Sequence, residues 1–247
     1  MQVETLLILS LSFLLISFLY SSVGHAGASG YLAVMALMSF PIESIKPVSL
    51  VLNIVVSLIA TYKFLKSGCF DKKVFLVFAA TSIPMAFVGG YIKIDSQWFK
   101  IFAGSFLVIT AFLLISRQFI KSTGEIKKVN TPLALLIGAV IGLVSGLLGV
   151  GGGIFLSPII LLLSWTSVKN ASGVAALFIL SNSVLGLAGH YASLKSVPFE
   201  TLYFIIVVAI GGFIGSYYGS QKFNSNIILG FLFLVLLSAG LKFIFIS

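Results

Sequence analysis

The sequence predicts an all-α polytopic membrane protein with about eight to ten transmembrane segments in two related five-segment halves. First, 59% of the residues are hydrophobic, 9% are charged and the mean hydropathy is +1.19, values that do not fit a water-soluble core. Second, most charged residues lie in three short windows, 63–73, 93–100 and 117–128, between long apolar runs. Third, each half carries a glycine-rich motif. Because the net charge of +9 lies in loops, a soluble enzyme, a disordered protein and a nucleic-acid binder are excluded.

Ten apolar segments of the chain are candidates for membrane helices, which need about 20 apolar residues to cross the hydrocarbon core. The second and seventh are short and open on glycines, so we predict short broken helices there. The first carries Glu4 and lacks the basic start of a signal peptide, which indicates a retained helix. The segments are residues 5–23, 27–40, 47–62, 74–92, 98–120, 132–148, 152–164, 171–191, 201–219 and 226–245.

The two halves of the chain are similar in sequence. Residues 62–71 and 191–200 are identical at five of ten positions, at an offset of 129. The same offset pairs Asn53 with Asn182, and an offset of 125 pairs the two glycine-rich motifs. Chance similarity in a chain rich in Leu, Ser and Gly is the alternative. Duplicated halves are common in secondary transporters, and paired glycine-interrupted segments point to their substrate sites.

The orientation of the predicted repeats, residues 1–124 and 125–247, follows from the basic loops. Lysines and arginine gather at 63–73 and 117–128, which predicts that both loops are cytoplasmic. Ten crossings would make the halves inverted, with both termini outside; eight crossings would make them parallel, with both termini inside. Inverted halves are favoured because the second-half counterpart of the first loop keeps only Lys195. We expect a multi-pass protein of the cell inner (plasma) membrane.

The second-half motif contains four glycines in five positions: Gly149, Gly151, Gly152 and Gly153. Each glycine costs a helix about 1 kcal/mol relative to alanine, so the chain should unwind here. Unwinding in lipid is tolerated only where protein or a watery cavity satisfies the freed amides, and a half-helix starting at Gly152 or Gly153 would present an anion site. The alternative is close helix packing, which better explains glycines spaced by four residues. Those are Gly138, Gly142 and Gly146, and Gly211, Gly215 and Gly219.

The first-half motif is less rich in glycine and contains Gly24, His25, Gly27, Ala28 and Ser29. A histidine at membrane depth can change its charge near neutral pH, so it can attract an anion when protonated or couple transport to protons. The alternative is a neutral histidine bonded to a backbone carbonyl. We expect the amides from Gly27 to Ser29 to complement those of the second motif.

Asn53 and Asn182 lie inside apolar segments at matching places in the two halves. An amide is costly to bury without partners, so each must bond either another helix or a passing solute. Ser157 offers a hydroxyl group to the same predicted cavity.

Catalysis, cofactors and metals are not expected. The only cysteine, Cys69, cannot close an intrachain disulfide or build a thiolate metal site. The six acidic residues are predicted near segment ends or in loops, so no acid–base pair can be assembled, and no ATP-binding P-loop is present. Passive flux or coupling to an ion gradient remains as the energy source.

The glycine cluster at 149–153 followed by Ser157 and Pro158, the related stretch 24–30 and the Leu-Lys-Ser-Gly sequence at 65–68 resemble the sulfite exporter TauE/SafE family over essentially the whole chain. The resemblance implies a polytopic membrane protein, usually of about eight helices in two related halves, that moves sulfite, sulfonates and other sulfur-containing organic anions. The first half departs from the commoner glycine-rich form at His25, Ala26 and Ala28 and lacks a proline equivalent to Pro158.

We therefore predict a secondary transporter, an exporter or permease, of small sulfur-containing anions in the lipid bilayer. The alternatives are an uncoupled channel-like permease and a non-transporting membrane anchor or regulatory subunit. Ion coupling and a homo-oligomer remain open, and nucleic acid is not an expected partner. The predicted substrate-binding residues are Gly24, His25, Gly27, Ala28, Ser29, Asn53, Gly149, Gly151, Gly152, Gly153, Ser157 and Asn182.

Overall fold

The computed structural model describes residues 3–22, 25–116, 126–194, 198–199, 201–218 and 225–245. This part of the chain contains ten α-helices and no strand, which confirms the predicted all-α fold. The helices are α1 (Val3–Ser22), α2 (Ala28–Leu37), α3 (Ile42–Lys66), α4 (Lys72–Tyr91), α5 (Ser96–Ser116), α6 (Thr131–Leu148), α7 (Gly153–Leu162), α8 (Val168–Leu194), α9 (Thr201–Tyr218) and α10 (Ser225–Phe245).

Helix length separates two kinds of element. Six helices, α1, α3, α4, α5, α6 and α8, are long and apolar enough to cross a membrane. Helices α2 and α7 have only ten residues each, which makes them about 15 Å long and able to cover half of the hydrocarbon core. The prediction of a multi-pass membrane protein with two short helices at the glycine motifs is confirmed.

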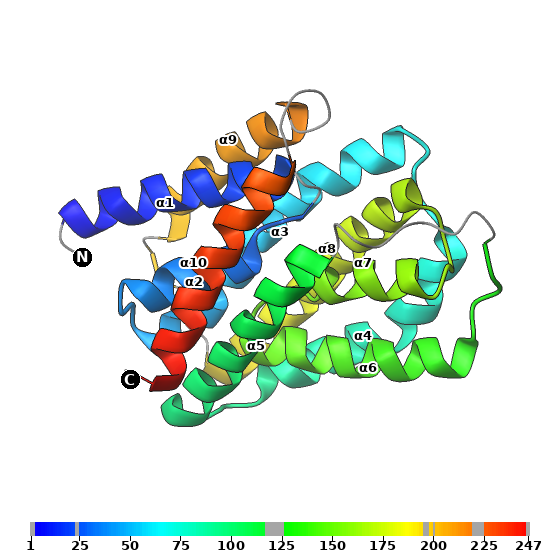
Figure 1. Cartoon of the computed structure of the whole chain (residues 1–247). Coiled ribbons are helices and arrows are strands. Elements are labelled where there is room, and N and C mark those ends of the chain that lie inside the picture. Colours follow the sequence, from blue (N-terminus) through cyan, green and yellow to red (C-terminus); the bar gives the residue numbers. More distant parts are fainter. Residues whose placement is uncertain are drawn as a thin grey trace.

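The bundle has two distinct ends. In Figure 1 both chain termini lie at one end, and the turn between α3 and α4 lies at the other. That turn follows Lys63 and Lys66 and precedes Lys72 and Lys73, so the basic segment gathers at the end opposite the termini.

The helix contacts join the first five helices to the last five. Helix α4 packs along α6 and α1 along α9, while α3 packs on α8 and α5 on α10. These contacts are consistent with a two-fold relation that replaces each helix by the one five places away in the chain. Under this exchange the α4–α6 pair becomes the α9–α1 pair, whereas the α3–α8 and α5–α10 pairs are converted into themselves. The contacts of α2 with α10 and of α7 with α5 exchange in the same way.

Glycines spaced by four residues form the tightest of these contacts. A Cβ atom on Gly146 of α6 would collide with the carbonyl oxygen of Ala86 on α4. Likewise, a Cβ atom on Gly215 of α9 would collide with the carbonyl oxygen of Phe18 on α1. Backbone therefore lies directly against backbone in both pairs, which confirms that these glycines serve close packing.

Helix α3 begins earlier than the sequence predicts. Its first residue is Ile42, after Pro41 at the N-cap, whereas the expected segment began at Pro47. Pro47 lies within the helix, so only the bond to the Glu43 carbonyl near the helix start is lost. The five added residues bring Lys46 onto the helix.

Candidate functional site

The link between α6 and α7 is unwound at the glycine cluster. Gly149, which ends α6, has a φ of 78°, and Gly151 and Gly152 have φ values of 71° and 76°. Residues with a side chain rarely adopt this left-handed region, so only glycine makes three such turns at low cost. The predicted break in the helix is confirmed, and α7 starts afresh at Gly153.

The amides that lead into α7 reach no acceptor among the described residues, unlike those later in its first turn. The amides of Phe155 and Leu156 bond the carbonyl oxygen of Gly152 at 3.2 and 3.3 Å. Among the described residues, by contrast, no acceptor receives a hydrogen bond from the amides of Gly151, Gly152 or Gly153. These groups are buried, and the positive end of the α7 dipole adds to their donor character.

Helix α2 starts in the same manner. Gly27 precedes it with a φ of 99° and without a side-chain cap, and the Tyr31 amide bonds the Gly27 carbonyl oxygen at 3.0 Å. The amides of Gly27, Ala28 and Ser29 reach no acceptor among the described residues. The start of α2 is therefore a second buried set of N–H donors.

The residues around the start of α2 are closely bonded. His25 is 4% exposed, and its backbone amide donates to the Tyr20 carbonyl at 2.9 Å. The hydroxyl of Ser29 bonds that of Tyr20 at 2.8 Å. Gly24, a predicted site residue, lies outside the described residues.

Ser49 on α3 brings the two motifs together. Its Oγ lies 2.8 Å from the carbonyl oxygen of Gly149 and 3.3 Å from that of Ala28, so one hydroxyl is shared between the two. The start of α2 and the link into α7 are therefore neighbours in space, although 121 positions separate Ala28 from Gly149 in the sequence.

Asn53 and Asn182 are both fully buried. Asn53 donates to the hydroxyl of Ser183 at 2.9 Å, and its Nδ2 lies where a Cβ on Gly151 would be. The Oδ1 of Asn53 and both polar atoms of Asn182 have no partner among the described residues. Burying an amide group without a hydrogen-bond partner costs about 1–3 kcal/mol. A polar solute that bonds these amides would recover part of this cost.

The two nearby serines differ in availability. Ser157, a predicted site residue, donates to the carbonyl of Gly153 at 3.1 Å and so bonds within its own helix. Ser145, which sequence analysis missed, has a buried Oγ with no described partner. Its Cβ lies 3.5 Å from the Cβ position of Gly152. The signal that could have revealed it is its place one helical turn before Gly149.

Lys46 is a second residue that sequence analysis missed. It is 8% exposed, and its ammonium donates to the carbonyl oxygens of Gly89, Gly90 and Ile92 at 3.2, 3.0 and 3.3 Å. Its backbone packs against Gly149. A lone lysine beside an apolar segment is the available signal, but Pro47 is typical of a helix start and so places Lys46 in the preceding loop.

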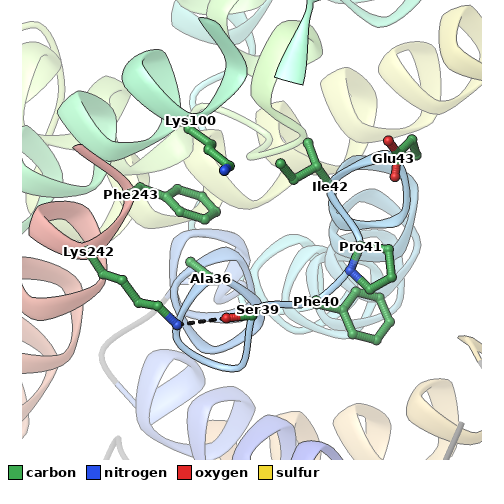
Figure 2. A pocket seen from close by; sticks show the side chains of 9 residues that line it. All are labelled: Ala36, Ser39, Phe40, Pro41, Ile42, Glu43, Lys100, Lys242 and Phe243. Carbon is green, nitrogen blue, oxygen red and sulfur yellow. Dashed lines mark hydrogen bonds between the residues drawn. The ribbon is translucent and has the colours of Figure 1, made fainter. Parts of the chain in front are cut away.

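Two pockets adjoin at the end of the bundle where α3 begins. One, of 270 Å³, is lined by Lys46 and His190 together with residues of the α4–α5 link. The other, of 450 Å³, is drawn in Figure 2. Ile42 and Glu43 line both, so these two residues form a wall between the two hollows.

The larger pocket has a cationic wall. The amines of Lys100 and Lys242 lie on one side of it, and the carboxylate of Glu43 lies across from them on the other (Figure 2). Lys242 donates to the Leu37 carbonyl at 2.6 Å and to the Ser39 hydroxyl at 3.0 Å, and so caps the end of α2.

These features define a class of protein. A multi-pass helical bundle, interrupted by two short helices whose first amides are buried, has the architecture of a membrane transporter. More specifically, the chain belongs to the sulfite exporter TauE/SafE family, whose sequence profile matches residues 9–243.

Known relatives carry transporter names. The chain is 37% identical to "Probable membrane transporter protein y4hK" of Sinorhizobium fredii (strain NBRC 101917 / NGR234) over 95% of its own length and 96% of the relative's. It is 23% identical to "Probable membrane transporter protein YdhB" of Bacillus subtilis (strain 168) over 89% and 90% of the two chains. "Probable membrane transporter protein YunE" of the same strain is 26% identical over 59% and 60%. No solved structure matches the chain significantly.

Proposed function

We propose that this protein is a secondary transporter of small anions, which bind between its two halves near the middle of the bilayer. The observation that carries the proposal is the meeting of two half-helix starts whose buried amides have no acceptor in the described part of the chain. Hydrogen-bond donors at a helix N-terminus stabilise negative charge without a buried cation. Asn53 contacts Gly151 and supplies a side-chain amide there, and Asn182 on α8 is a second buried amide with no partner among the described residues.

The proposed substrates are sulfite, sulfonates and other sulfur-containing organic anions. Their support is the family to which the chain belongs. The oxygens of a sulfite or sulfonate group are acceptors only, and they match a site that presents N–H donors from two directions. Glu43 and Asp95, the acidic residues that line the 270 Å³ pocket, are exposed at the end of the bundle.

The two halves are proposed to be inverted repeats, residues 1–124 and 125–247, in the cell inner membrane. Adding 125 to the bounds of α2 gives those of α7, and adding 129 to the bounds of α5 gives those of α10. The exchange of α4–α6 for α9–α1 supports the same symmetry. The basic α3–α4 turn is then cytoplasmic and both termini are outside.

The test is sulfite flux into liposomes that contain the purified protein, with protein-free liposomes as the control. We expect saturable uptake, because a site that binds a solute fills. A coupled transporter responds to an imposed pH gradient, and an uncoupled permease does not. Uptake equal to the protein-free control for sulfite, methanesulfonate and thiosulfate would overturn the proposal and favour a non-transporting subunit.

A further inference from the structure

Lys46 is the one Lys, Arg, Asp or Glu side chain that is buried among the residues the structure describes. Its three hydrogen bonds all go to backbone carbonyl oxygens at the end of α4, and none of its contacts is with a carboxylate. A charged group at membrane depth is costly and is usually functional. The charge of Lys46 is solvated by carbonyl dipoles but is not neutralised.

Lys46 lies on the face of α3 that reaches the candidate site. It is followed at spacings of three and seven residues by Ser49 and Asn53, which places all three on one side of the helix. Ser49 bonds the carbonyl of Gly149, and Asn53 contacts Gly151. Along the helix axis, Lys46 is about 10 Å from Asn53.

The pocket of 270 Å³ connects this charge to the surface. Lys46 and His190 are its buried polar lining residues, beside the buried ring of Phe99, whereas Lys93, Glu43 and Asp95 are exposed at its rim. Charges at the rim are screened by water and salt much more than a buried charge is. Lys46 therefore dominates the electrostatic potential at the floor of the pocket.

The position of Lys46 is not required by the proposed repeat. The offset of 129 that aligns α3 with α8 places Ala175, which is also buried, opposite Lys46. The positive charge is thus confined to the end of the site that faces the chain termini. If a lysine here were needed only for the packing of α3 and α8, a lysine would be expected at the matching position of both helices.

We propose that the 270 Å³ pocket is the vestibule of the anion path, and that Lys46 at its floor draws a small oxyanion toward the glycine turn at 149–153. This inference rests on the proposed function and adds the residue that selects negative charge. A charge at this distance changes anion affinity on the order of tenfold. The carbonyl oxygens at the end of α4 hold the ammonium in place. Lys46 therefore attracts the anion through its electrostatic field and does not have to leave these carbonyls.

The experiment separates the charge of Lys46 from its capping role. Lys46→Gln keeps hydrogen-bond donors for the α4 carbonyls but removes the charge, and Lys46→Arg keeps the charge. We expect Lys46→Gln to raise the KM for sulfite uptake about tenfold, with Vmax changed less than twofold. Lys46→Arg should stay within threefold of the wild type. Lys72→Gln, the same change at an exposed lysine outside both pockets, should change KM less than twofold.

Restoring the charge provides a second measurement. In a Cys69→Ser background, Lys46→Cys should show the raised KM, and modification with 2-aminoethyl methanethiosulfonate should return it toward the wild-type value. If Lys46→Gln fails to fold, the KM of Lys46→Cys before and after modification tests the role of the charge instead. An unchanged KM in Lys46→Gln, or no recovery after modification, overturns the role of Lys46. Absence of sulfite flux in the wild type instead overturns the proposed function itself.

Discussion

Helices α2 and α7 share their backbone form but differ in the chemistry around them. Both have ten residues, both follow a left-handed glycine, Gly27 or Gly152, and both end before a left-handed serine, Ser39 or Ser164. Their starts each present buried amides with no described acceptor. The shape that exposes N–H groups is therefore the common property of the two half-helices.

The differences lie in side chains. Helix α7 is approached through three left-handed glycines, and α2 through one, with His25 just before it. Lys242 caps the end of α2, whereas the residue 129 positions earlier, on α5, is Leu113. The backbone N–H donors are therefore present at the starts of both short helices, whereas the charged side chain accompanies only α2. The three changes below test this division.

Gly152→Leu is expected to have the largest effect. At a φ of 76° a side chain is strained, and a Cβ there would lie 2.6 Å from Ile141. The turn that presents the amides cannot then form, so sulfite flux in liposomes should be lost while the protein still inserts into membranes. Gly230→Leu is the matched control, because nothing lies within 4 Å of its Cβ position. Flux within twofold of the wild type in Gly152→Leu would show that this turn is not the site.

The two buried asparagines should respond differently to leucine. Asn182→Leu removes an amide that has no described partner, so the free energy of unfolding should stay equal or rise while sulfite flux falls about tenfold. Asn53→Leu breaks the bond to Ser183 and should lower the free energy of unfolding by about 1 kcal/mol. Thermal unfolding and flux, measured on the same preparations, provide the check. A loss of stability without loss of flux in Asn182→Leu would assign it to helix packing.

Lys242→Met should have the smallest effect of the three. It removes two hydrogen bonds from the end of α2, and because this group is partly solvated we expect a loss of about 1 kcal/mol in the free energy of unfolding. The KM for sulfite should change less than twofold. Lys72→Met, at an exposed lysine, is the control for removing a charge. A larger change in KM than in stability would make the pocket of Figure 2 part of the anion path.

The helices and their two breaks were predictable because both follow from local composition. Ten apolar runs gave ten helices, and the chain unwinds at the glycines of 149–153 because each glycine costs a helix about 1 kcal/mol relative to alanine. The expected short segments 27–40 and 152–164 were three and two residues too long at their ends, since Ser39 and Ser164 turn the chain although their residue type gives no signal.

The assembly of the site was beyond sequence reasoning because it depends on contacts between distant helices. Ser49 joins the start of α2 to the link into α7, a contact that no local sequence pattern indicates. Lys46 was hidden because Pro47 suggested a helix start, while the true start was set by Pro41. Asn53 and Asn182 were found because paired amides in apolar segments are costly to bury.

The glycine contacts also determine which parts of the molecule can slide. Carbonyl oxygens occupy the space beside Gly146 and Gly215, so the backbone of α6 packs directly on α4 and that of α9 on α1. No side chain lies between the helices at these points that could change its rotamer to let them move. Each such pair takes one helix from each half of the chain. A rocking motion that separates the first half of the sequence from the second would have to pull both pairs apart, so the rigid bodies of any transport cycle each combine helices from both halves.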